Sequence, residues 1–177
     1  DLRKQLGAAG VDRFFGGLIV LFLLIMYKRM NLTLPVLVLL MMALGLHNLK
    51  FYGNFYMGLP FDRIMHFFAV FTISVAAFQF LNSCEGKKCD NIWKPAITSI
   101  LVAVGIASFV EIMEFVGYSF LGQGEGLLFY GTGDIGEWNN VSWDLISNTL
   151  GAITGSVLMM FITIKNKMKV RFKDQYF

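Results

Sequence analysis

Long apolar stretches separated by short polar ones run along the whole sequence. Five of them stand out, at residues 14–30, 32–49, 64–82, 95–118 and 141–164. Each is near the length of about 20 residues that an α-helix needs to cross a bilayer. Charged residues gather between these stretches instead of recurring along a solvent-facing stripe, as they would in a soluble protein. The pattern predicts an all-α polytopic membrane bundle of about five transmembrane helices.

Composition supports a membrane protein. Of 177 residues, 56% are apolar and 15% are charged, and the mean hydropathy is +0.61. These values exclude the soluble globular, disordered and nucleic-acid-binding classes. We expect residues 1–177 to form a single integral membrane domain in the cell membrane, with the lipid bilayer as partner and no nucleic acid. Because the chain begins with Asp1 and not with Met, a further helix upstream stays open.

The distribution of Lys and Arg predicts which way the bundle faces. With five antiparallel helices, ten of the 15 basic residues fall on one side, in the first hairpin, the loop between the third and fourth helices, and the C-terminal tail. The positive-inside rule puts that side in the cytoplasm. The prediction is a multi-pass protein with a cytoplasmic C-terminus and a Gly-rich extracytoplasmic loop at residues 117–140.

Two cysteines bear on this orientation. Cys84 and Cys89 lie in the loop between the third and fourth helices, which the charge count makes cytoplasmic. A disulfide between them would invert the orientation, whereas cytoplasmic thiols would stay reduced. We favour reduced thiols, and a metal pair is a minor alternative because two more ligands are missing nearby.

Three predicted helices each carry a pair of polar residues three or four apart, and so on one helix face. These pairs are Asp62 and His66, Glu111 and Glu114, and Asp144 and Asn148. Ionisable groups in a span are costly and normally face the bundle interior. Because consecutive helices run in opposite directions, we expect all three pairs at the same end of the bundle. His47 at the end of the second helix and Asp134 in the Gly-rich loop are expected at the same level.

Most of these residues also have a structural explanation. Asp62 and Asp144 are predicted near helix N-termini, where a carboxylate complements the helix dipole. His66 taken alone would be a hydrogen-bonded core histidine. Glu111 and Glu114 resist such an explanation, because near a helix C-terminus the dipole opposes them and they repel one another. These two glutamates therefore need a cation or a shared proton.

Two glycines continue the polar stripe of the fifth helix. Gly151 and Gly155 are four apart, a spacing of small residues that lets two helices approach closely. We expect them to form a helix-packing face and not part of a site.

Together the polar residues predict an acidic site at the outer leaflet. Seven carboxylates and two basic residues are expected around this face, so the face should attract cations. Carboxylates with one or two histidines suit Mg, Ca, Mn, Zn or non-haem Fe. We predict a divalent metal as cofactor, with these ligands: Asp62, His66, Glu111, Glu114 and Asp144. Further polar members of the cluster are His47, Asp134 and Asn148. Shared protonation of the carboxylates, and ion pairing with Arg63 or with a partner subunit, are the rival explanations.

The same motifs resemble a known family. FDRIMHFF, EIMEF, GTGD and WDLISNTLGAITG, in this order, resemble the YjdF-type bacterial inner-membrane family and are similar to the wider VanZ-like group, over about residues 10–165. IGEWNNVSWD departs from the family pattern, in which Trp-Asp follows soon after Gly-Asp. The resemblance implies a polytopic membrane protein without a settled activity, and the VanZ-like group is associated with glycopeptide-antibiotic resistance.

Three functions stay open, and the sequence does not decide whether the protein is an enzyme. The first is a site for a divalent cation or polar headgroup, in which one carboxylate or His66 acts as general base for a metal-bound water on lipid or envelope substrates. The second is an accessory or structural subunit of a larger multi-subunit membrane complex. A transporter ranks last, because no inverted repeat is visible. Covalent catalysis is disfavoured, because no Ser or Cys nucleophile is paired with a base.

Overall fold

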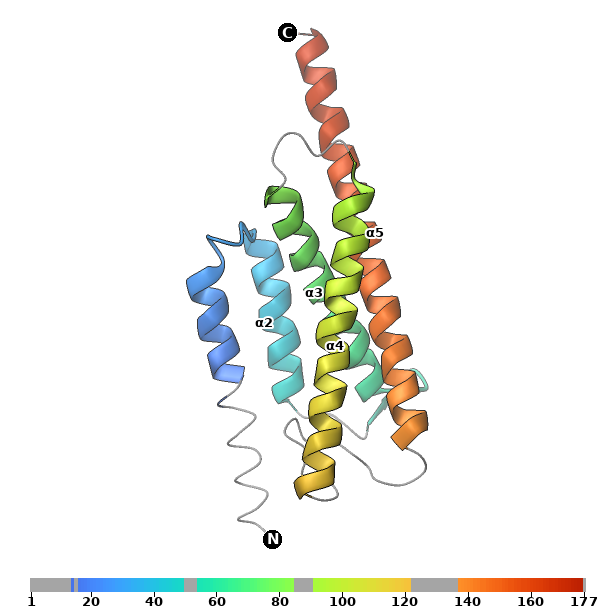
Figure 1. The fold of residues 1–177 in the computed structure, drawn as a ribbon. Coiled ribbons are helices and arrows are strands. Elements are labelled where there is room, and N and C mark those ends of the chain that lie inside the picture. The colour runs from blue at the N-terminus through green and yellow to red at the C-terminus, as the bar shows by residue number, and fades with distance from the viewer. Residues whose placement is uncertain (1–13, 15, 50–53, 85–90, 122–136, 177) are drawn as a thin grey trace.

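In its described residues the protein is an all-α helix bundle interrupted by a small β-hairpin (Figure 1). The computed structural model describes residues 14, 16–49, 54–84, 91–121 and 137–176. The elements in chain order are an N-terminal helix (Gly16–Met26), α2 (Leu34–Asn48), β1 (Phe55–Tyr56), β2 (Leu59–Pro60), α3 (Phe61–Cys84), α4 (Trp93–Leu121) and α5 (Glu137–Tyr176).

Three of these helices are long and apolar enough to cross a membrane. Judged by length and composition, the candidate spans are Phe61–Ser83, Trp93–Met113 and Val141–Lys169, with 23, 21 and 29 residues. The N-terminal helix and α2 are also apolar but have between 10 and 17 residues each. All five predicted helices are therefore present, and within the described ranges three of them reach spanning length.

The helices continue beyond the ends that hydropathy predicts. α4 runs to Leu121 and α5 begins at Glu137, so their connection is residues 122–136 and not 117–140. α5 also continues through the basic tail and has 40 residues in all. As a result, Asp144 lies about two turns inside α5, and Glu111 lies about three turns from the end of α4. The predicted dipole effects on both residues are wrong, because the influence of a helix end fades within one turn.

α3 is the central helix of the bundle. It packs against α2, α4 and α5. The start of α3, the end of α4 and the start of α5 all lie at the lower end of the bundle in Figure 1. Small side chains such as Ala103 and Ala152 form the core between these three helices. Hydroxyl groups add hydrogen bonds between helices: Ser74 Oγ donates to the carbonyl oxygen of Ala152 at 2.8 Å.

Gly151 and Gly155 let α5 lie directly on the backbone of α3. A Cβ atom built at Gly155 would lie 2.6 Å from the carbonyl oxygen of Phe71, and one at Gly151 would overlap the carbonyl oxygen of Phe67. Side chains larger than hydrogen are therefore excluded unless the two helices separate. The predicted helix-packing face is confirmed.

Candidate metal centre

Three helices supply the polar side chains at the lower end of the bundle. Asp62 and His66 lie one turn apart at the start of α3, and Asp144 and Asn148 lie one turn apart in α5. Glu111 comes from α4, which runs in the opposite direction. Periodicity thus sets each pair on one helix face, and the alternating direction of the helices brings the pairs to one level (Figure 1).

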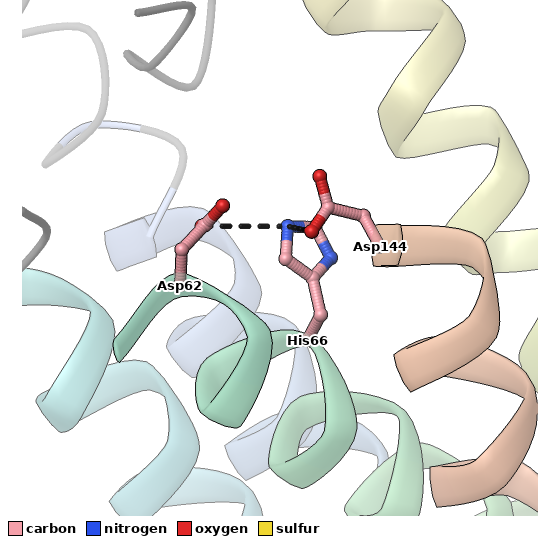
Figure 2. Close-up of side chains that lie close together, drawn as sticks. All are labelled: Asp62, His66 and Asp144. Atoms are coloured by element: carbon pink, nitrogen blue, oxygen red, sulfur yellow. Dashed lines mark ion pairs between the residues drawn. The ribbon is translucent and has the colours of Figure 1, made fainter. Parts of the chain in front are cut away.

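The imidazole of His66 is at the centre of this cluster. Its Nε2 lies 3.6 Å from Oδ1 of Asp62 and 3.9 Å from Oδ1 of Asp144. Its Nδ1 lies 3.5 Å from Oε1 of Glu111 and 3.3 Å from Oδ1 of Asn148. Figure 2 shows the two aspartates approaching the ring from α3 and α5. One ring nitrogen therefore faces two aspartates, and the other faces a glutamate and an amide oxygen.

Asn148 links the histidine to Glu111. Its Nδ2 donates a hydrogen bond to Oε1 of Glu111 at 3.4 Å, so its Oδ1 is the atom turned toward His66. An amide oxygen only accepts hydrogen bonds, so the hydrogen in this contact must come from Nδ1 of His66. The neutral ring therefore carries its proton on Nδ1.

The cluster is buried on one side and more open on the other. Asp144 and Asn148 are each 1% exposed, and Glu111 is 7% exposed. The side chain of Asp62, in contrast, is 27% exposed. Solvent or a ligand would reach the cluster from the side of Asp62.

Asp62, His66 and Asp144 lie close enough together to be candidate metal ligands. One atom from each lies within 4.8 Å of the other two, and in the described part of the chain these residues form the one such group of His, Cys, Asp or Glu. Neighbouring ligands of a bound Zn²⁺ or Mg²⁺ are about 3 to 3.5 Å apart. A small inward movement of the side chains would therefore complete a three-ligand site.

The other predicted site residues have different placements. Glu111 and Asn148 contact His66 from the opposite edge of the ring. His47 lies half-buried in the last turn of α2 and is not a member of the three-residue group. Glu114 belongs to α4, but its side chain is outside the described residues, as are Asp134, the Gly-rich connection and Cys89.

Sequence reasoning missed one interaction beside the cluster. The guanidinium carbon of Arg63 lies 4.7 Å from the centroid of the Trp143 ring, a cation–π contact between α3 and α5. Each of these residues is the immediate neighbour of a cluster aspartate in the sequence, which is the signal that could have indicated their contact. Arg63 therefore has an aromatic partner on α5.

The bundle and its polar cluster define a membrane protein with three candidate spans and ionisable groups at one end of them. Residues 8–165 match the family described as predicted membrane protein DUF2238, and the chain belongs to this family. The match is consistent with the YjdF-type resemblance, and the wider VanZ-like grouping stays a prediction. Comparisons with curated proteins and with solved structures gave no match.

Proposed function

We propose that the cluster binds a divalent cation, with Asp62, Nε2 of His66 and Asp144 as its ligands. The observation that carries this proposal is the set of neighbours around the His66 ring. Since Nδ1 faces two acceptors, it holds the proton of the neutral ring. Nε2 is then an acceptor that faces two carboxylates, at 3.6 and 3.9 Å. Three acceptors directed at one another repel, and a cation among them removes this repulsion.

A proton on Nε2 is the main rival to a metal ion. With all carboxylates ionised, the resulting imidazolium and three neighbouring carboxylates would carry a net charge of −2. A divalent cation with a neutral imidazole would reduce the net charge to −1. Uncompensated charge is costly in a poorly solvated bundle, so charge balance favours the cation. Sharing of protons among the carboxylates and ion pairing with Arg63 or a partner subunit are the remaining rivals, and metal analysis separates both from cation binding.

Glu111 and Asn148 would contact the ligand His66 and not the metal ion itself. Metal-binding histidines almost always donate their second ring N–H to a carboxylate, a carbonyl oxygen or water, which orients the ring and increases its basicity. Here Glu111 and Asn148 provide those acceptors at Nδ1. We therefore propose a positioning role for both residues, whereas the sequence prediction made Glu111 a direct ligand.

Three protein ligands leave coordination positions for other groups. A metal ion with open positions can activate water or hold a phosphate or carboxylate oxygen. This is the chemistry of a hydrolase or transferase that acts on lipid or envelope substrates. The exposed side of Asp62 would be the direction of entry.

Elemental analysis of the purified protein tests the proposal. The protein should be isolated with an affinity tag that does not bind metal, and calorimetric titrations should follow with Mg²⁺, Ca²⁺, Mn²⁺, Zn²⁺ and Fe²⁺ each alone. We expect about one equivalent per chain and a higher unfolding temperature in the presence of the metal, because a ligand of the native state stabilises it. EDTA should reverse this increase.

Matched variants distinguish cation binding at this cluster from non-specific attraction of cations to acidic residues. His66→Ala and Asp144→Asn should abolish cation binding, while Thr149→Ala should leave it unchanged. Thr149 is exposed on the same helix, and its hydroxyl group donates a hydrogen bond to the backbone carbonyl oxygen of Leu145. If no divalent metal copurifies or binds at physiological concentration, the proposal fails. The accessory-subunit function then becomes the better choice, and retention of partner subunits during native purification would support it.

A further inference from the structure

The β-hairpin before α3 exposes apolar side chains at its turn. Phe55 is 70% exposed, Leu59 is 54% exposed, and Met57 at the tip is 104% exposed. Residues 54–60 contain no charged side chain. Hairpin turns in water are normally polar, so this composition is unusual for a solvated loop.

The conformation at the tip makes the choice of Met57 still less expected. Met57 and Gly58 connect the two strands, with φ angles of +55° and +82°. A two-residue turn with both φ angles positive favours Asn-Gly or Asp-Gly. An unbranched apolar residue gains nothing from this conformation. The exposed side chain of Met57 is therefore better explained by apolar surroundings that lie outside the protein.

The hairpin is fixed to the membrane-spanning part of the protein. The backbone N–H of Phe61 donates to the carbonyl oxygen of Asn54 at 2.9 Å, and the rings of Tyr56 and Phe61 lie 5.6 Å apart. Phe61 is itself buried and is the first residue of the candidate span Phe61–Ser83. The hairpin therefore adjoins the end of this candidate span, where a membrane-spanning α3 would leave the hydrocarbon layer. Among the described residues the sheet has these two strands alone, so the backbone groups on its outer edges need water or headgroups and the hydrocarbon core is excluded as its location.

We propose that residues 54–60 form a membrane-interface wedge, in which Phe55, Met57 and Leu59 enter the boundary between lipid headgroups and acyl chains. Aromatic and other amphipathic side chains are enriched at this level. The wedge would fix the depth of the first turns of α3, and with them Asp62 and His66. This inference is independent of whether the cluster binds a cation.

Electron paramagnetic resonance of a spin label at the tip tests the wedge. A nitroxide is attached to Met57→Cys in a Cys84→Ser, Cys89→Ser background, in vesicles of zwitterionic and anionic phospholipid. Collision rates are measured with oxygen, which concentrates in lipid, and with chromium oxalate, which stays in water. Leu101→Cys, exposed near the middle of the candidate span Trp93–Met113, gives the lipid reference, and Lys169→Cys, at the end of α5's candidate span, gives the aqueous reference.

We expect the label at position 57 to give an oxygen-to-chromium collision ratio several-fold above that of Lys169→Cys and nearer to that of Leu101→Cys. A ratio equal to that of Lys169→Cys would put the hairpin in water and overturn the proposal. Low collision rates with both reagents would indicate a protein partner over the tip, and would overturn it as well.

A second variant tests the side chain itself. Met57→Asn keeps a residue that adopts a positive φ angle readily, so the turn is retained while the apolar tip is lost. With the label at Leu59→Cys, this substitution should move the collision ratio toward the aqueous reference, with no loss of thermal stability in detergent. An unchanged ratio would show that Met57 does not hold the hairpin in the interface.

Discussion

At the scale of the residue, the two nitrogens of His66 separate the proposed metal ligands from the residues proposed to orient the ring. Nε2 faces Asp62 and Asp144, and Nδ1 faces Glu111 and Asn148. A sequence motif such as Asp-x3-His sets the two side chains on one helix face but does not choose the ring orientation. That orientation depends on the amide of Asn148, which is held in turn by Glu111.

Asn148→Ala should weaken cation binding by about 10- to 100-fold, the usual effect of removing a partner of a metal-binding histidine. The reason is that Nδ1 of His66 loses one of its two acceptors and the ring loses its orientation. Calorimetric titration with the metal that copurifies with the wild type measures the change. Thr149→Ala is the matched control. Equal affinities for Asn148→Ala and the wild type would exclude the positioning role while leaving the three ligands untouched.

At the scale of the element, the sequence predicted the existence of the helices better than their ends. Apolar runs marked α3, α4 and α5 correctly, because burial in lipid requires a continuous apolar surface. Hydropathy reports where the surroundings change from lipid to water, and a helix can continue past that point. Polar residues such as Asn139 and Asn140 were therefore assigned to a loop, although they lie in the first turns of α5.

The cluster, too, could be predicted from the sequence only in part. The face shared by Asp62 and His66, and the meeting of α3 with α5, followed from helical periodicity and antiparallel succession. The β-hairpin was missed because Met-Gly does not carry the usual Asn-Gly turn signal. The cation–π contact of Arg63 with Trp143 was missed because it joins two helices that are distant in sequence, and the signal for it was only that each residue adjoins a cluster aspartate.

Gly155→Ala should destabilise the bundle by about 1–3 kcal/mol, the range for inserting a methyl group into a packed contact. The added Cβ would lie 2.6 Å from the carbonyl oxygen of Phe71 and would force α5 away from α3. Equilibrium unfolding in mixed micelles measures the loss. Gly105→Ala is the control, because nothing lies within 4 Å of its added Cβ. The control should be neutral or stabilising by up to about 1 kcal/mol, since alanine favours the helix over glycine.

If both substitutions had the same effect, backbone flexibility and not helix contact would explain the glycines. The contact would then have no special role in joining α3 to α5.

At the scale of the whole molecule, α5 extends farther than the other helices. In Figure 1 its C-terminal part continues beyond the upper end of the bundle, opposite to the polar cluster. This part carries Lys165, Lys167 and Lys169, whose side chains are exposed. By the positive-inside rule we propose that the upper end is cytoplasmic and that the cluster faces outward.

Cysteine labelling checks this orientation. In a Cys84→Ser, Cys89→Ser background, Lys169→Cys should react with a membrane-impermeant maleimide after the cells are opened and not in intact cells. Labelling of Lys169→Cys in intact cells would contradict the proposed orientation and put the C-terminus outside.

The glycine contact between α3 and α5 also bears on which ion the cluster would select. Asp62 and Asp144 are carried by two helices whose backbones already touch about two turns away, so the helices have little freedom to separate at the level of the two carboxylates. Mg²⁺ and Zn²⁺ hold their oxygen ligands at about 2.0–2.2 Å, whereas Ca²⁺ needs about 2.3–2.6 Å and more ligands. The ligand atoms lie within 4.8 Å of one another and have to move inward around either ion, and helices held this close let the side chains reach the shorter bond lengths of a small ion. Preference for a small ion over Ca²⁺ would then originate in two residues that have no side chain.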